Sequence, residues 1–165
     1  MKKKTKIVRN DIFFDEIADR IAAGEKVIIK AKGESMRPFI RNGCDKIVLE
    51  KLEGEDLKKG NIVLARLSDG RFVVHRIEKV EKDGLVLRGD GNLATLEVCR
   101  FQDVVAQATA VVHNGKTIAK GSIRWKWQGW LWPSGVFLRR LLLGLDRRWS
   151  RKTGIELETL TAEKR

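Results

Sequence analysis

The stretch Phe72-Val73-Val74-His75-Arg76-Ile77 decides the fold, because it is a run of β-branched and aromatic residues set between two turn signals. Asp69-Gly70 precedes the run and Asp83-Gly84 follows it, and each dipeptide favours a tight two-residue hairpin turn. Side chains alternate along a strand, so His75 shares a face with Val73 and Ile77. The stretch therefore predicts a strand of an antiparallel sheet that carries a histidine among apolar neighbours.

Similar short runs continue on both sides of this strand, and they predict a mainly β fold, a coiled antiparallel β-sheet domain. Asn114-Gly115 is a further hairpin signal, and His113 just before it is predicted to lie beside a surface turn. Asp11 to Ala23 has apolar residues at helical spacing, with Asn10 or Asp11 as its cap and Gly24 at its end, which predicts an N-terminal helix. The predicted strands are 26–32, 46–50, 61–67, 71–80, 84–88, 104–112 and 116–119.

A candidate nucleophile lies in Gly33-Glu34-Ser35-Met36-Arg37-Pro38, where a glycine and a proline favour a sharp turn that displays Ser35. A serine hydroxyl attacks well only when a neighbouring group takes its proton, and His75 is the candidate base. Asp90, in the turn Gly89-Asp90-Gly91-Asn92, is a candidate orienting acid for that histidine. Structural alternatives stay open: Ser35 as a turn cap, His75 as a hydrogen-bonded core residue, and Asp90 as a turn aspartate.

Together these segments, from about Val27 to Val112, resemble the serine peptidases that include signal peptidase I and the LexA-type repressors. Where bacterial members carry a catalytic lysine, this chain has His75, within a Val-His-Arg stretch like that of the endoplasmic-reticulum-type enzymes. The resemblance implies a coiled β domain in which Ser35 attacks and His75 acts as the base. In the endoplasmic-reticulum-type enzymes a second aspartate follows the Gly-Asp turn. Here the nearest following acid is Glu97, which leaves the third catalytic residue open.

The oxyanion site departs from the bacterial pattern too, because Gly33 stands where signal peptidases carry a hydroxyl side chain. The backbone N–H groups of Ser35 and Glu34 are then the expected donors. Met36 and Pro38 are the expected residues of the substrate pocket. The sequence indicates no cofactor and no metal site.

The net positive charge comes from two segments near the ends of the chain. Residues 1–10 hold five basic residues and no acid, and residues 120–152 hold nine against Asp146 alone, whereas residues 11–119 hold eighteen of each sign. All five tryptophans fall in the second basic segment, followed by an apolar stripe at helical spacing that predicts an amphipathic helix over residues 134–150. That helix would contact an anionic membrane or a partner, or else pack on the β domain. The expected contact residues are Trp125, Trp127, Trp130, Trp132, Phe137, Arg139, Arg140, Arg147, Arg148 and Trp149.

Three parts follow from this pattern: a basic arm and short helix (1–24), a serine-peptidase-like β domain (25–119) and a basic, Trp-rich C-terminal segment (120–165). The predicted function is a serine endopeptidase with a Ser35–His75 dyad that cleaves an extended precursor peptide. One alternative is a catalytically idle binding module that docks a membrane or protein partner; another is a LexA-like self-cleaving regulator. With no signal peptide and no long apolar stretch, the expected location is the cytoplasm or the inner membrane surface. Specific nucleic-acid binding is not expected, because residues 1–25 hold room for one helix only.

Overall fold

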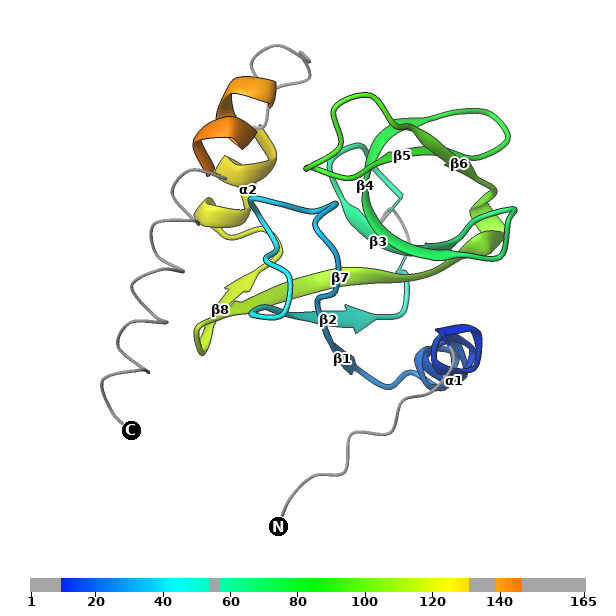
Figure 1. Ribbon diagram of the computed structural model, residues 1–165. Helices are drawn as coiled ribbons and strands as arrows, with labels where there is room; N and C mark the ends of the chain where they lie inside the picture. Colours follow the sequence, from blue (N-terminus) through cyan, green and yellow to red (C-terminus); the bar gives the residue numbers. More distant parts are fainter. Residues whose placement is uncertain (1–9, 54–56, 131–138, 147–165) are drawn as a thin grey trace.

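The computed structural model describes residues 10–53, 57–130 and 139–146, with a single antiparallel sheet as its centre (Figure 1). The sheet runs in the order β1-β2-β7-β3-β4-β5-β6, and β8 also pairs with β7. The fold is thus mainly β, as predicted. The strands are β1 Val27–Lys30, β2 Lys46–Glu50, β3 Ile62–Arg66, β4 Phe72–Val80, β5 Leu85–Arg88, β6 Glu97–Cys99, β7 Val104–His113 and β8 Lys116–Ala119.

All seven predicted strand runs are present, but β6 is a strand that the sequence pattern did not indicate. It has only three residues, too few to show a strand pattern in the sequence. Its pairing with β5, through Leu85↔Cys99 and Leu87↔Glu97, holds it in the sheet. A short 3-10 helix, η1 Phe101–Asp103, then leads into β7. This addition matters below, because β6 brings an acid to the candidate site.

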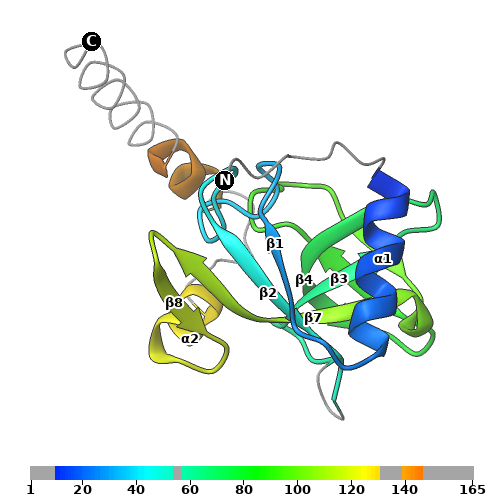
Figure 2. The same cartoon turned by 90° about the horizontal axis from the view of Figure 1, so that it is seen from below.

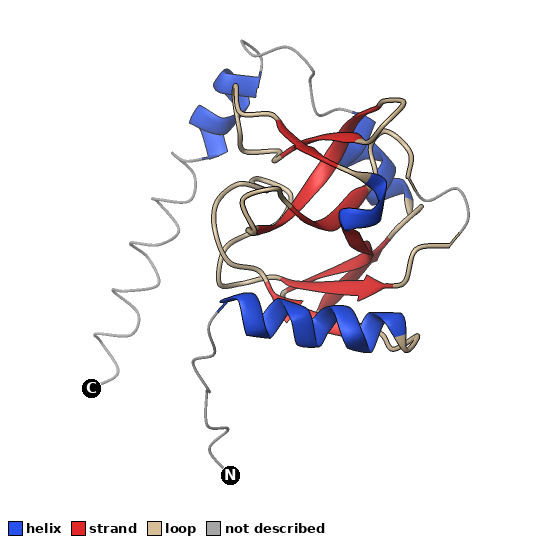
Figure 3. Ribbon diagram, turned by 90° about the vertical axis from the view of Figure 1, so that its right-hand side faces the viewer, coloured by secondary structure: helices blue, strands red, loops and turns tan. Residues whose placement is uncertain are grey.

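The strand β3 separates two apolar cores, since both of its faces are buried. Ile62 and Leu64 pack with side chains from β1, β2 and β7, whereas Val63 and Ala65 pack with side chains from β4 and β5. The long strand β7 pairs with β2, β3 and β8, and so joins the two halves of the curved sheet seen in Figure 3. Because side chains along β3 point alternately into the two cores, this one strand belongs to both.

Helices cover the first core. The helix α1 Asn10–Ala22 buries Ile17 and Ile21 there and lies across β1 and β7, as Figure 2 shows. The helix α2 Ile123–Trp130 begins where the hydroxyl of Ser122 accepts a hydrogen bond from the N–H of Trp125. Residues 139–146 form a further helical segment. In the described parts of the chain, no helix has both the length and the apolar character needed to cross a membrane.

Candidate active site

The candidate nucleophile lies on a turn that the first core holds in place. Met36, Phe39 and Ile40 are all buried, whereas Ser35 is half-buried at the start of the turn. The N–H of Ile40 donates to the carbonyl of Met36 at 2.9 Å, which closes the turn. Because three apolar side chains anchor residues 36–40, the backbone presents the Ser35 side chain at the edge of the core rather than inside it.

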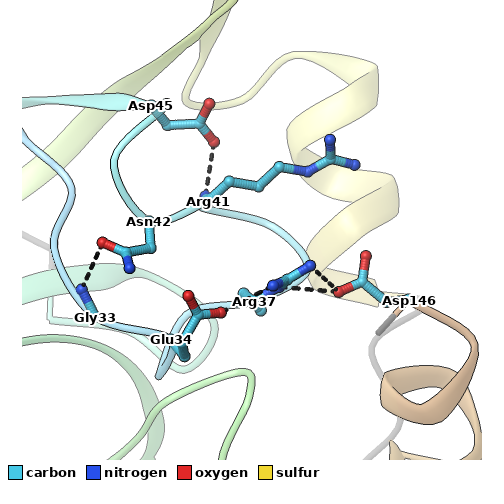
Figure 4. Close-up of polar contacts among 7 residues, drawn as sticks. All are labelled: Gly33, Glu34, Arg37, Arg41, Asn42, Asp45 and Asp146. Carbon is cyan, nitrogen blue, oxygen red and sulfur yellow. Dashed lines mark hydrogen bonds and ion pairs between the residues drawn. The ribbon is translucent and has the colours of Figure 1, made fainter. Parts of the chain in front are cut away.

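The far end of this loop is tied back by polar groups (Figure 4). The N–H of Gly33 donates to Oδ1 of Asn42 at 3.1 Å, and the N–H of Arg41 donates to Oδ2 of Asp45 at 2.8 Å. Asp45 is fully buried, and its Oδ1 lies 2.6 Å from Nδ1 of His113. The hairpin at Asn114 is formed as predicted, but His113 is more than a neighbour of a surface turn: its imidazole faces this buried acid.

The turn at residues 89–92 packs backbone to backbone against the nucleophile turn. The N–H of Gly91 donates to the carbonyl oxygen of Ser35 at 2.7 Å. A β-carbon added to Gly91 would lie 2.5 Å from the carbonyl oxygen of Glu34, and one added to Gly89 would lie 2.4 Å from that of Ser35. Only glycine allows such close approach at these two positions. The Gly-Asp-Gly pattern therefore serves to bring the two turns together.

His75 lies at the junction of these turns, with 4% of its surface exposed. A β-carbon added to Gly89 would lie 3.1 Å from Nε2 of His75 as well as 2.4 Å from the Ser35 carbonyl oxygen. Nε2 therefore faces the nucleophile turn. Ser35 and His75 line the same cleft of about 220 Å³, together with apolar side chains that include Met36 and Phe72. Within the described residues no hydrogen bond joins the Ser35 hydroxyl to His75. Such bonds are often long before substrate binds.

The other ring nitrogen of His75 faces an acid that the sequence pattern left open. Nδ1 lies 2.5 Å from Oε2 of Glu97, whose side chain is 13% exposed. The two atoms approach closely without the alignment of a regular hydrogen bond, and neither has another hydrogen-bond partner among the described residues. Burial lowers the pKa of His75 below its ordinary 6.5, and the Glu97 carboxylate opposes that shift. Of these opposed effects, burial is the larger.

Strand register explains how Glu97 reaches the imidazole. Glu97 on β6 pairs with Leu87 on β5, and Leu87 pairs with Ile77 on β4, two residues beyond His75 and on the same face. Glu97 therefore lies on the same face of the sheet as His75, and β5 lies between their two strands. The only sequence signal for it is that it is the first acid after the Gly-Asp-Gly turn.

Asp90, the predicted orienting acid, is held by Arg76. Its two carboxylate oxygens accept hydrogen bonds from Nε and Nη2 of Arg76 at 2.8 and 2.7 Å. Arg76 also donates to the carbonyl of Gly60 and lies over the ring of Phe39. Because Arg76 and His75 are adjacent on a strand, their side chains leave opposite faces. The geometry joins Asp90 to the Arg76 face, and it joins Glu97 to His75.

The remaining predicted site residues divide in two. The N–H groups of Ser35 and Glu34, the expected oxyanion donors, donate to no acceptor in the described part of the chain. Met36 lines the cleft, whereas Pro38 is half-buried and lies outside its lining. No cluster of three metal-ligating side chains occurs among the residues that the structure describes.

Two of the expected C-terminal contact residues are corrected by the structure. Trp125 is buried with its ring edge-to-face against Phe39, and Arg139 is 3% exposed. Both pack on the β domain and neither can face a membrane. Arg140 is exposed, as are Leu141 and Leu145. The side chains of Trp127 and Trp130, and residues Trp132, Phe137, Arg147, Arg148 and Trp149, lie outside the described part of the chain.

Comparison with known families identifies the family of this chain. The family model described as Peptidase S24-like matches residues 4–111, a span that includes Ser35, His75 and Glu97. The match confirms the resemblance to LexA-type and signal-peptidase-like serine peptidases. It ends before the basic C-terminal segment. Comparison with curated proteins gives no match.

Proposed function

The chain belongs to the Peptidase S24-like family, and we propose that it is a serine endopeptidase in which Ser35, His75 and Glu97 act as one unit. The observation that carries this proposal is the placement of His75 between two partners. Its Nδ1 meets the Glu97 carboxylate at 2.5 Å, and its Nε2 faces the turn that displays Ser35. A buried imidazole held in this way suits a general base.

In the proposed reaction, the Ser35 hydroxyl oxygen attacks the carbonyl carbon of a peptide bond while Nε2 of His75 takes the hydroxyl proton. Glu97 stabilises the imidazolium that results and fixes the ring orientation. The imidazolium then donates its proton to the departing amine as the C–N bond breaks, leaving an acyl ester on Ser35. A water molecule, deprotonated by the same imidazole, hydrolyses the ester and returns Ser35 to its starting form.

The backbone around Ser35 supports the stabilisation of the tetrahedral intermediate. The N–H groups of Ser35 and Glu34 would donate to the oxyanion, in place of the side-chain hydroxyl that Gly33 cannot supply. The cleft beside Ser35 is lined largely by apolar side chains, among them Ile29, Met36 and Phe72. It suits a peptide that lies in extended conformation and places an apolar side chain next to the scissile bond.

A fluorophosphonate probe tests the catalytic unit without knowledge of the natural substrate. Wild-type protein should be labelled once, on Ser35, as located by peptide mass spectrometry. Ser35→Ala should abolish labelling. His75→Ala should slow it by several orders of magnitude, and the double variant should lose no more than Ser35→Ala alone, because the residues act together. Wild-type protein that resists labelling at every pH would leave the idle binding module as the better account.

We also propose that the C-terminal segment contacts an anionic membrane surface. The exposed side chains of Leu141 and Leu145, beside the exposed Arg140, support this proposal. The full chain should co-sediment with vesicles that contain phosphatidylserine, and binding should weaken as salt rises. Leu141→Ser with Leu145→Ser should reduce binding, and equal binding to neutral vesicles, or none to either, would refute the membrane contact.

A further inference from the structure

The helical residues 139–146 touch both turns that form the candidate active site. Arg139 donates from Nη1 to the carbonyl oxygen of Asn92 at 3.1 Å. Asp146 accepts from Nε and Nη2 of Arg37 at 3.0 and 2.9 Å, as Figure 4 shows. Leu143 between them is buried. Spacings of four and three residues place Arg139, Leu143 and Asp146 along one face of the helix, and that face is the one directed at the site.

The two contacted residues lie next to the catalytic groups. Arg37 follows Ser35 by two positions, and it also donates to the side chain of Glu34 at 3.0 Å. Asn92 follows Gly91, whose N–H donates to the carbonyl of Ser35. The helix therefore holds the nucleophile turn with one end and the glycine turn with the other. These are the two backbone segments that meet at Nε2 of His75.

The charges of the segment fit a specific attachment. Asp146 is the only acid in residues 120–152, and among the described residues it pairs with Arg37 of the nucleophile turn. Arg139 is buried although a guanidinium is costly to bury unless it is hydrogen-bonded. An arginine that served only solubility would remain in solvent, as Arg140 does.

We propose that residues 139–146 are a clamp for the active site, in which Arg139 and Asp146 are positioning residues for Ser35 and His75. The inference rests on the proposed peptidase function. The clamp lies beyond residues 4–111, outside the part of the chain that the family model matches. Loss of either polar attachment lets the two turns separate, and Ser35 then spends less time within reach of His75.

Labelling by the fluorophosphonate probe measures this effect in the full chain. Arg139→Gln and Asp146→Asn should each lower the first-order labelling constant kinact by about 10- to 100-fold, with the inhibition constant KI nearly unchanged, because a small misplacement of reacting groups costs that much. Arg124→Gln is the control matched in charge to Arg139→Gln, since Arg124 is exposed on α2 and its loss removes the same positive charge. A merely structural role would lower the unfolding temperature and leave kinact of the folded protein intact.

Hydrogen exchange at the Gly91 amide separates the clamp from the proposed function. That amide donates to the Ser35 carbonyl, so it should exchange faster in Arg139→Gln and Asp146→Asn than in Arg124→Gln. If wild-type protein is not labelled, the peptidase proposal fails, and faster Gly91 exchange in the two variants still supports a clamp that joins the turns. If both variants match Arg124→Gln in Gly91 exchange, and in kinact wherever labelling occurs, the clamp is refuted.

Discussion

Two histidines in this chain meet a carboxylate through Nδ1, and they differ in what surrounds the second ring nitrogen. His75 lies 2.5 Å from Glu97, and His113 lies 2.6 Å from Asp45. The pairs differ in what surrounds them: Nε2 of His75 faces the turn that displays Ser35, whereas His113 ends β7 beside a hairpin and lies outside the cleft. A histidine–acid pair is therefore not a catalytic unit by itself. The group that faces the second nitrogen decides its role.

The acids of the two pairs also differ in their other bonds. Asp45 accepts the N–H of Arg41 with its second oxygen, so it fixes the end of the nucleophile loop. The second oxygen of Glu97 lies 3.7 Å from the exposed Arg71. Asp45 is thus an internal structural anchor, while Glu97 is a partly accessible group whose main contact is the imidazole.

The largest expected effect separates the pairs by activity. Glu97→Gln should slow fluorophosphonate labelling of Ser35 by about 10²- to 10⁴-fold, because an amide neither stabilises the imidazolium nor fixes the tautomer. Asp45→Asn is the matched change in the other pair and should leave the labelling rate per folded molecule close to that of wild type. Equal losses in the two variants would contradict the assignment of Glu97 as the orienting acid.

The second prediction probes the Nε2 side of His75. Gly89→Ala would place a methyl group 2.4 Å from the Ser35 carbonyl and 3.1 Å from Nε2, so the turn must move away. A displacement of about 1 Å is enough to slow labelling by about 100-fold. The labelling constant should fall at temperatures where circular dichroism still shows a folded protein. A variant that loses structure and labelling at the same temperature would show only that Gly89 stabilises the fold.

The sequence pattern singles out candidate residues whose signals are local. Ser35 stands out because a glycine and a proline flank it, and His75 because its strand is bounded by two turn dipeptides. Glu97 could not be assigned, since its place depends on a three-residue strand and on two successive registers across the sheet. Asp90 lies in the turn that packs against Ser35, but its carboxylate is bonded to Arg76, whose side chain leaves β4 on the face opposite to that of His75.

The C-terminal segment shows the same limit. Its amphipathic pattern predicted a helix, and residues 139–146 are helical. The pattern could not say which side would pack on the β domain, because the partners of Arg139 and Asp146 are 47 and 109 residues away in sequence. Arg139 was therefore expected at a membrane or partner surface, although its hydrogen bond to Asn92 holds it inside.

A third prediction separates the pairs by stability. His113→Ala removes the partner of a fully buried Asp45 oxygen and should lower the free energy of unfolding by about 2–4 kcal/mol. His75→Ala should cost less, because Glu97 is 13% exposed and can be solvated when its partner is lost. Urea unfolding followed by tryptophan fluorescence measures both variants. A larger loss for His75→Ala than for His113→Ala would show that the His75 pair is the main structural anchor.

The smallest expected effect is a shift in pH dependence, and it is specific to one pair. Burial lowers the pKa of His75, so the labelling rate should rise with a midpoint below pH 6.5 as the imidazole loses its proton. The Glu97 carboxylate favours the imidazolium and raises that pKa, so the residual labelling of Glu97→Gln should have a midpoint at still lower pH.

Asp45→Asn should leave this midpoint in place, because Asp45 contacts His113 and is not among the charges that shift the pKa of His75. Measurement of kinact/KI for the fluorophosphonate from pH 4.5 to 9 gives all three midpoints. A shift toward higher pH in Glu97→Gln would contradict the electrostatic contact between Glu97 and His75. A wild-type rate that rises only in the alkaline range would instead indicate a lysine base, and His75 would then belong with His113 as a structural residue.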